Sequence, residues 1–319
     1  MIKVSQILLA VLAAAVAAFA SRWIAWQRTN EKMVSLLLME DKDPLSSQDM
    51  ASSVKRQTEL YNQLPPVVKR YLAKVLLYVD EEEQPEAILD LDKIRKIKAL
   101  RMHQTGSMLL EDTWHPFRAF QTMSAVHSNV GFLWDATVLL QVQSPPMGEF
   151  PYNGLDIPVS VRDAFVQGVG DLDARLLRVI TLAHIEDSPD INEGELMRWL
   201  AEACLIPTAL LPSEVLSWVA VPNEPKQARL IFTDVHSNTK ADLLVSFDDD
   251  DLLRNMEGMR AKSVGNNKFE HAKWEGRVLD YQTHDGMLLP LKMEVGWYSD
   301  DELDIYWKGE AVDFNFTYY

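Results

Sequence analysis

The chain has 319 residues, 47% of them hydrophobic, and a formal net charge of −16 at pH 7. This composition is that of a globular protein with a core, and the acidic excess disfavours binding to nucleic-acid phosphates. The single cysteine, Cys204, excludes an intramolecular disulfide, and its apolar neighbours predict a buried, unreactive thiol.

The N-terminus carries an uninterrupted apolar run, Ile7–Ala20, after a single lysine, Lys3. These features match the charged and apolar regions of a secretory signal, and Ala18–Ala20 offers small residues for cleavage. The first interpretation is therefore a cleaved signal sequence.

The alternative is an uncleaved anchor that extends the run toward the roughly 20 residues of a spanning helix. Trp23 and Trp26 would then lie at the lipid interface, with Arg22 reaching toward water. We favour the anchor because of this tryptophan pair, and the orientation in the membrane stays open. The sequence thus predicts a signal or anchor in residues 1–28, a tether in 29–63 and one domain in 64–319, in a membrane-anchored or secreted protein.

The predicted domain opens with a helix at Leu64-Pro65-Pro66, since proline suits a first helical turn. After an acidic loop at Asp80–Glu86, the apolar period changes to two from Ile97 onward. Strands are expected at Trp114–Ala125, Gly131–Val138, Val159–Phe165, Ser217–Val221, Gln227–Thr233, Asp242–Phe247, Leu252–Arg260, Trp274–Thr283, Leu288–Trp297 and Leu303–Lys308, with a long loop at Gln143–Pro158 and a helix at Leu172–Leu182.

Short strands at this spacing predict a mainly β fold. We expect a strongly curved antiparallel sheet or half-barrel with a few helices packed against it, preceded by the N-terminal apolar helix.

The stretch Asn192–Pro212 reads as a further helix with a proline-bracketed exit. Asn192 is expected to cap it, and Glu195 to complete a capping box. Glu195, Arg198 and Glu202 follow at spacings of three and four, so they share one face.

This charged face has two interpretations. In the functional one it points into a cavity, joined by Asp171, Asp173 or Glu186, with Glu195 or Glu202 as general base. In the structural one Glu195 caps the helix, Arg198 pairs with Glu202, and Trp199 packs on the sheet. We favour the structural interpretation because such ion pairs are common on helices, and leave the direction of the face open.

A helix over the mouth of a curved sheet would also enclose an apolar pocket. The candidate ligand-binding residues are the large aromatics of the predicted sheet and helix: Trp114, Trp134, Phe165, Trp199, Trp274 and Trp297.

Metal and cofactor motifs are weak in this sequence. Asp248–Asp251 lacks the alternating ligands of a calcium loop and is expected to form a hairpin turn. The histidines show no zinc-binding spacing, and Gly168-Val169-Gly170 lacks the third glycine of a dinucleotide fingerprint. We therefore predict no metal and no cofactor.

The chain resembles a mostly bacterial family of proteins that share a domain of unknown function. The resemblance spans about Leu64 to Lys308 and rests on ordered motifs: Leu64–Leu72, Trp114-x-Pro116-Phe117, Gly131-Phe132-x-Trp134, Arg162–Phe165, Gly168-x-Gly170, Ala174–Leu177, Gly194–Glu202, Pro207–Pro212, Trp274–Gly276, Asp280-Tyr281, Asp285–Met287, Pro290-Leu291, Glu294-Val295 and Tyr306-Trp307.

The resemblance implies a fold similar to the curved antiparallel sheet of bacterial lipoprotein carriers. It implies no established activity, substrate or catalytic residue. The chain departs from the family pattern in the longer loop Gln143–Pro158 and in the added segment Ser21–Asn62.

These observations favour a membrane-tethered or secretory-pathway protein that binds a hydrophobic or amphipathic small molecule or lipid. The alternatives are a hydrolase-like enzyme that uses Glu195, Arg198 and Glu202, and an acidic module that binds a basic protein.

Overall fold

The computed structural model describes residues 4–39, 47–76, 89, 91, 93–142, 155–265 and 268–319. Its helices are α1 (Val4–Leu37), α2 (Ser47–Asn62), α3 (Pro66–Leu76) and α4 (Pro189–Glu202), and α4 is followed by the short 3-10 helices η1 (Ala203–Leu205) and η2 (Pro207–Leu210). Its strands are β1 (Ile97–Leu110), β2 (Thr113–Ser124), β3 (Gly131–Val142), β4 (Leu155–Val166), β5 (Val169–Leu176), β6 (Ile180–Glu186), β7 (Leu216–Ala220), β8 (Gln227–Thr233), β9 (Lys240–Phe247), β10 (Leu253–Ser263), β11 (Phe269–His284), β12 (Met287–Ser299) and β13 (Glu302–Tyr318).

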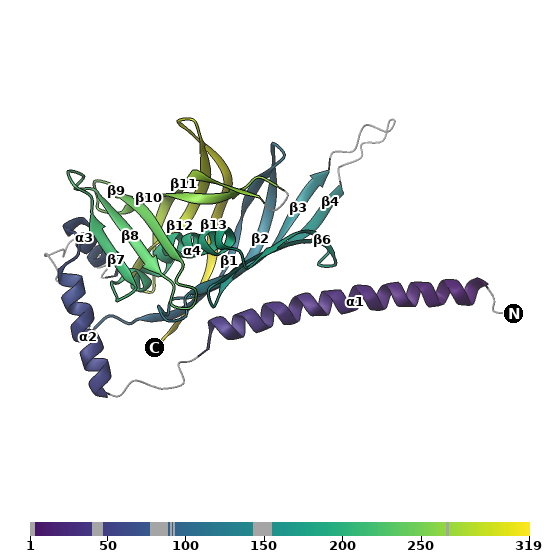
Figure 1. The fold of residues 1–319 in the computed structure, drawn as a ribbon, viewed down its shortest axis with the longest axis horizontal. Helices are drawn as coiled ribbons and strands as arrows, with labels where there is room; N and C mark the ends of the chain where they lie inside the picture. Colours follow the sequence, from purple (N-terminus) through teal and green to yellow (C-terminus); the bar gives the residue numbers. More distant parts are fainter. Residues whose placement is uncertain are drawn as a thin grey trace.

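All of these strands form one antiparallel sheet in the order β6-β5-β4-β3-β2-β1-β13-β12-β11-β10-β9-β8-β7. Consecutive strands are neighbours except β6 and β7, and β1 also pairs with the last strand, β13. The sheet curves strongly and stays open, with β6 and β7 as its edges, and the chain passes from one edge to the other through α4 (Figure 1). The predicted fold class is confirmed.

The two faces of the sheet carry different helices. On the concave face, the main core packs α3, α4, η1 and η2 against side chains such as Leu100, Phe132 and Phe232. On the outer face, the second half of α1 packs Leu37 against Leu133 and its neighbours. Because side chains alternate along a strand, neighbouring residues such as Phe132 and Leu133 belong to opposite faces.

Figure 1 shows α1 running along the outside of the sheet and projecting beyond it toward the N-terminus. The helix continues without a break across the predicted boundary at residue 28, and Trp26 and Asn30 are both buried. In the part of the chain that the structure describes, no helix is long and apolar enough to cross a membrane.

The proline-led helix is confirmed as α3, with Pro66 at its start and Tyr71 packed on Phe247 at a ring distance of 5.4 Å. The segment before it is also ordered. α2 contacts the domain through Arg56, whose Nε donates to Glu214 at 2.7 Å, and through Gln57, which donates to the Pro212 carbonyl at 3.2 Å.

The helix predicted at Leu172–Leu182 is wrong, because this segment forms β5, a turn and β6. Leu172, Leu176 and Ile180 recur at helical spacing, which suggested the helix. Pairing with β4 overrides this local pattern, and Leu177 and Arg178 adopt positive φ angles of 53° and 64° to reverse the chain.

The other strand predictions are confirmed in place, although most strands are longer than expected. Leu303–Lys308 and the alternating tail after it form a single strand, β13. The expected loop at Asp80–Glu86, and residues 143–154 of the loop expected at Gln143–Pro158, lie outside the described residues; 155–158 belong to β4.

Asp248–Asp251 forms the predicted hairpin turn, between β9 and β10. Asp248 Oδ1 accepts from the backbone amides of Asp250 and Leu252 at 3.0 and 2.9 Å. The Arg70 hydrogen bond to Asp251, aided by Lys226, lowers the pKa of Asp251 to about 2. Through Arg70, Asp251 therefore links α3 to the sheet.

Candidate functional site

The charged helix α4 lies in the hollow of the sheet, but its start differs from the prediction. Ser188 is the N-cap, and its side chain accepts from the Ile191 amide. Asn192 instead accepts from the Gly170 amide at 2.7 Å, which ties α4 to the start of β5. The predicted capping box of Asn192 and Glu195 is therefore wrong, because Pro189 takes the first helical position and starts the helix earlier.

Arg198 is the centre of the charged face. Its Nε donates to Glu202 at 2.8 Å, and its Nη1 donates to Asp163 on β4. The guanidinium also lies over Phe132 and Trp134, at 4.6 and 5.1 Å from the ring centroids. The face therefore points inward, onto the concave side of β2–β4.

Burial opposes the charge of Arg198, but the carboxylates of Glu202, Asp163 and Glu195 outweigh it and raise the pKa of Arg198. The arginine is thus fixed in its charged form. Gln121 on β2 donates to the second oxygen of Glu202, so the predicted Arg198–Glu202 pair is confirmed within a larger network.

Glu195 is the most buried acid of this face. Its Oε1 lies 3.4 Å from Arg260 Nη2, and Arg260 Nε donates to the Gly194 carbonyl at 3.0 Å. Burial, followed by the negative charge of Asp163, raises the pKa of Glu195 well above its ordinary value.

A proton on Glu195 makes the network electrically neutral. The cluster holds the cations Arg198 and Arg260 and the carboxyl groups Asp163, Glu195 and Glu202. Glu195 Oε2 and Asp163 Oδ1 are buried and have no hydrogen-bond partner among the described residues, and Asp163 helps to raise the pKa of Glu195. A proton shared by the two side chains would satisfy both oxygens.

Asp171, Asp173 and Glu186 do not join this cluster, so that part of the functional interpretation is wrong. In the β4–β5 register Asp163 pairs with Leu172, which places Asp171 and Asp173 on the opposite face of the sheet.

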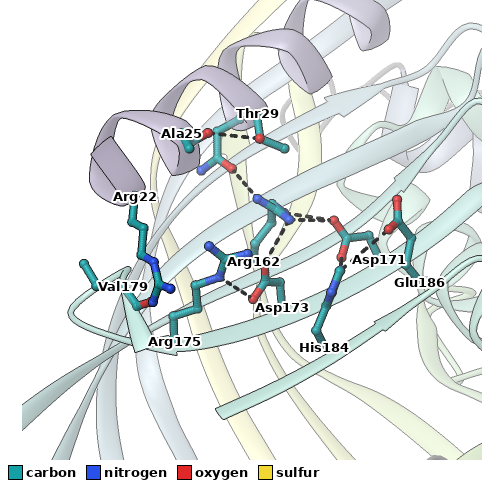
Figure 2. Close-up of polar contacts among 11 residues, drawn as sticks. Arg22, Ala25, Thr29, Arg162, Asp171, Asp173, Arg175, Val179, His184 and Glu186 are labelled. Atoms are coloured by element: carbon teal, nitrogen blue, oxygen red, sulfur yellow. Dashed lines mark hydrogen bonds and ion pairs between the residues drawn. The ribbon is translucent and has the colours of Figure 1, made fainter. Parts of the chain in front are cut away.

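Those acids instead belong to a second buried cluster on the outer face, beneath α1 (Figure 2). Arg162 Nε donates to Asp171 at 2.9 Å and its Nη2 donates to Asp173 at 3.1 Å. Arg175 also donates to Asp173, at 2.6 Å, and His184 Nε2 lies 3.3 Å from Asp171.

The second cluster holds α1 on the sheet. Arg162 Nη1 lies within 3.4 Å of Asn30 Oδ1, and the guanidinium groups of Arg162 and Arg175 lie 4.8 and 5.3 Å from the Trp26 ring. Sequence reasoning missed this cluster because its members come from segments about 130 residues apart in the chain. The alternation of Asp171, Asp173 and Arg175 along one strand was the available signal.

The six predicted ligand-binding aromatics occupy different environments. Trp134, Phe165, Trp199 and Trp274 are buried in the concave core, Trp297 is partly buried there, and Trp114 is exposed on the outer face beside Lys308. Trp134 and Trp199 use their indole nitrogens within the fold, toward Gln104 at 2.8 Å and the Ser124 carbonyl at 3.0 Å. Ligand contact by these residues stays a prediction.

Beyond the helices, the concave face carries further apolar side chains that sequence reasoning did not select. They are partly buried and pack against the main core: Met108, Leu140, Val161, Met293, Val295, Tyr306 and Trp307. Trp307 stacks on Phe117 at 5.7 Å, and Trp297 stacks on Tyr306 at 6.0 Å. Strand alternation places most of these residues on one face. Tyr306 and Trp307 are adjacent, and both pack against the main core because the β12–β13 register shifts between Val295 and Gly296.

The outer face has a shallow depression of about 360 Å³ over β10–β12. Its central acid, Glu275, is already bound by Arg277 and by the Tyr298 hydroxyl at 2.5 Å. Across the described residues, His, Cys, Asp and Glu side chains form no group arranged to hold a metal ion.

Several solved structures are similar to the chain, among them three that cover most of it. A putative outer membrane lipoprotein-sorting protein domain from Vibrio parahaemolyticus is 9% identical, with a TM-score of 0.35 over 68% of this chain and 84% of that one. A LolA superfamily protein from Nitrosomonas europaea is 7% identical, with a TM-score of 0.34 over 78% and 90%. A DUF1329 family protein from Desulfovibrio piger is 10% identical, with a TM-score of 0.36 over 83% and 93%. A shared function does not follow from identities this low.

A comparison with curated proteins finds no match. The model of a family of unknown function, DUF6920, matches residues 62–316, which span α3 and nearly the whole sheet. This range covers most of the chain and agrees with the resemblance seen in the ordered motifs. The chain therefore belongs to this family of unknown function (DUF6920).

Proposed function

We propose that the protein binds a hydrophobic or amphipathic ligand on the concave face of its sheet and associates with a membrane through α1. The observation that carries the proposal is the set of partly buried apolar residues on the concave face, including Met108, Leu140 and Trp307. Each keeps part of its apolar surface in water.

An apolar ligand would cover this surface. Removing apolar surface from water contributes about 25 cal/mol per Å². The core beneath, which includes the fully buried Phe132 and Trp134, is closely packed and would hold the ligand-contacting side chains in place. The helices α3 and α4 leave the ends of the strands uncovered (Figure 1), so the apolar residues there are the proposed contact surface.

A brominated fatty acid tests this binding, because bromine quenches tryptophan emission only at close range and Trp297 and Trp307 lie on the proposed surface. We expect saturable quenching that the unbrominated fatty acid does not produce. Met108→Glu should weaken binding by about tenfold or more, since it places a charge against the ligand.

Met259→Glu is the matched control, because Met259 is 56% exposed on the outer face of β10. It should leave the quenching curve unchanged. Equal quenching curves for the wild type and both variants, or no saturable quenching at all, would contradict concave-face binding.

Membrane association is proposed from the first half of α1. Leu12, Val16 and Phe19 are exposed apolar residues, and no charged residue occurs between Val4 and Ser21. Such a segment is unfavourable in water and favourable in lipid. In this proposal the predicted anchor, residues 1–28, meets the membrane through its part before Trp26, because Trp26 is buried on the sheet. Residues 29–63 link it to the domain, and α2 contacts the domain.

An enzyme that uses the α4 face is the second candidate, favoured by the raised pKa of Glu195 beside Asp163. A carboxyl whose pKa is raised is suited to general acid catalysis. However, both oxygens of Glu202 and the guanidinium of Arg198 already have protein partners. A purely structural role, the polar link between α4 and the sheet, is therefore sufficient to account for the network.

A further inference from the structure

Exposed apolar side chains gather where α1 leaves the sheet. In and beside the β5–β6 turn, Leu177, Ile180 and Leu182 are 46%, 54% and 55% exposed. Arg22 of α1 donates from Nη1 to the Val179 carbonyl of this turn at 3.1 Å, which holds the turn against the helix (Figure 2). The apolar turn and the exposed half of α1 are therefore adjacent.

The exposed half of α1 continues the stripe that packs on the sheet. Residues of this stripe recur every three, four or seven positions and share one helical face: Leu12, Val16, Phe19, Trp23, Trp26, Asn30 and Leu37. Trp26, Asn30 and Leu37 are buried on the sheet, whereas Leu12 and Val16 are 63% and 60% exposed. The uncovered part of the stripe therefore points to the same side as the β5–β6 turn.

The charge of this corner suits an anionic surface. Across Val4–Leu37 the only acid is Glu31, against the exposed bases Arg22, Arg28 and Lys32, although the whole chain carries −16. Basic residues next to an apolar helix are attracted to anionic lipid headgroups, and tryptophan prefers the same depth. An acidic soluble protein could also bind the basic residues of α1. It would not cover the uncharged, apolar first half of the helix as lipid would.

We propose that the corner formed by Phe19, Trp23, Leu177, Ile180 and Leu182 rests on an anionic lipid surface. The projecting half of α1 enters the lipid, and Arg22 lies at the headgroup level, where it keeps its bond to the turn. This inference rests on the membrane association proposed above and adds a second contact, made by the sheet itself.

This contact between the corner and the lipid would also orient the proposed ligand surface. Because β1 to β6 are joined in sequence by antiparallel hairpins, the β1–β2 and β5–β6 turns lie at the same end of the sheet. Met108 and Leu140 lie near that end of β1 and β3. The open end of the concave face therefore meets the lipid from which a hydrophobic ligand would come.

Single-cysteine labelling of the full chain tests whether the corner contacts lipid. In a Cys204→Ala background, Ile180→Cys and Leu182→Cys carry an environment-sensitive fluorophore on β6. Val219→Cys is the matched control, because Val219 is 47% exposed on β7, the opposite edge strand. The chains are bound to phosphatidylcholine–phosphatidylglycerol vesicles that contain a nitroxide-labelled lipid.

We expect the nitroxide to quench the labels at positions 180 and 182 at least about twofold and iodide in the water to quench them poorly, as for groups within the headgroup layer. The label at 219 should show the reverse. Unchanged thermal midpoints of the labelled variants establish that the fold is intact.

Three outcomes would contradict the lipid contact of the corner. Binding to the vesicles is measured by flotation in a density gradient. If the chain floats with the vesicles while all three labels behave alike, the corner does not touch lipid, although membrane association stands. If the chain does not float, both proposals fail. If labels 180 and 182 are shielded without vesicles, in a way that depends on protein concentration, a second copy of the chain covers the corner instead.

Discussion

Glu195 shows how the fold changes the chemistry of a single residue. On the sequence it is an ordinary helix acid, whereas in the structure it is buried between Asp163 and Arg260 with its pKa raised well above the usual value. A carboxyl whose folded pKa exceeds its unfolded value of about 4.3 stabilises the fold below that value. This contribution is lost as the pH rises through the folded pKa.

Glu195→Gln tests this assignment, because the amide imitates the protonated carboxyl at every pH. Between pH 4.3 and neutral, the free energy of unfolding of the wild type should fall relative to that of Glu195→Gln, by on the order of 1 kcal/mol. Urea unfolding at pH 5 and pH 7 measures the difference.

The control for this experiment is Glu224→Gln, which changes an exposed acid in the β7–β8 turn. Between pH 5 and pH 7 its free energy of unfolding should change by the same amount as that of the wild type. If the free energy of Glu195→Gln also changes by the same amount, Glu195 is ionised in the fold and the shared proton is wrong.

At the scale of elements, α1 owes its place on the sheet to one buried aromatic and one buried ion cluster. Trp26 is 1% exposed, and Arg162 and Arg175 lie against its ring. Arg162 could not keep its charge buried without Asp171 and Asp173, so the helix and the cluster stabilise each other.

Trp26→Ala should therefore release α1 locally. Truncating a buried tryptophan costs about 3–5 kcal/mol, and here most of that cost falls on the docking of one helix. Trypsin should then cleave after Arg28 and Lys32 at least about tenfold faster. Trp23→Ala, at an exposed position on the same helix, serves as the control. Equal cleavage rates in the two variants would show that Trp26 does not hold the helix.

At the scale of the whole molecule, the sheet separates two surfaces. The concave face holds the proposed ligand surface and the α4 network, while the outer face holds α1 and its ion cluster. The helix proposed to contact lipid and the surface proposed to bind a ligand therefore lie on opposite sides of the same sheet.

The proposed function requires that α1 stays attached in the mature protein. Mass spectrometry of the protein isolated from its membrane fraction should show an N-terminus within the first few residues of the chain. A start at Ser21 would remove the exposed residues Leu12 to Phe19 and contradict the anchor. It would favour the cleaved signal and leave concave-face binding untouched.

Much of this architecture follows from the sequence alone. Alternating apolar residues such as Leu100 and Met102 predicted the strands, and proline at position 66 predicted the start of α3. These patterns are local, because a strand shows its two faces in its own residues. The turn at Asp248–Asp251 and the burial of Cys204 were equally readable.

Only the tertiary structure decided which residues meet across the sheet. Strand register placed Asp163 beneath Arg198 and sent Asp171 and Asp173 to the other face, where they meet Arg162 and α1. It also overrode the helical spacing of Leu172–Leu182. The direction of the Glu195, Arg198 and Glu202 face depended on the curvature of a sheet whose strands lie far apart in the chain, and no local pattern records that curvature.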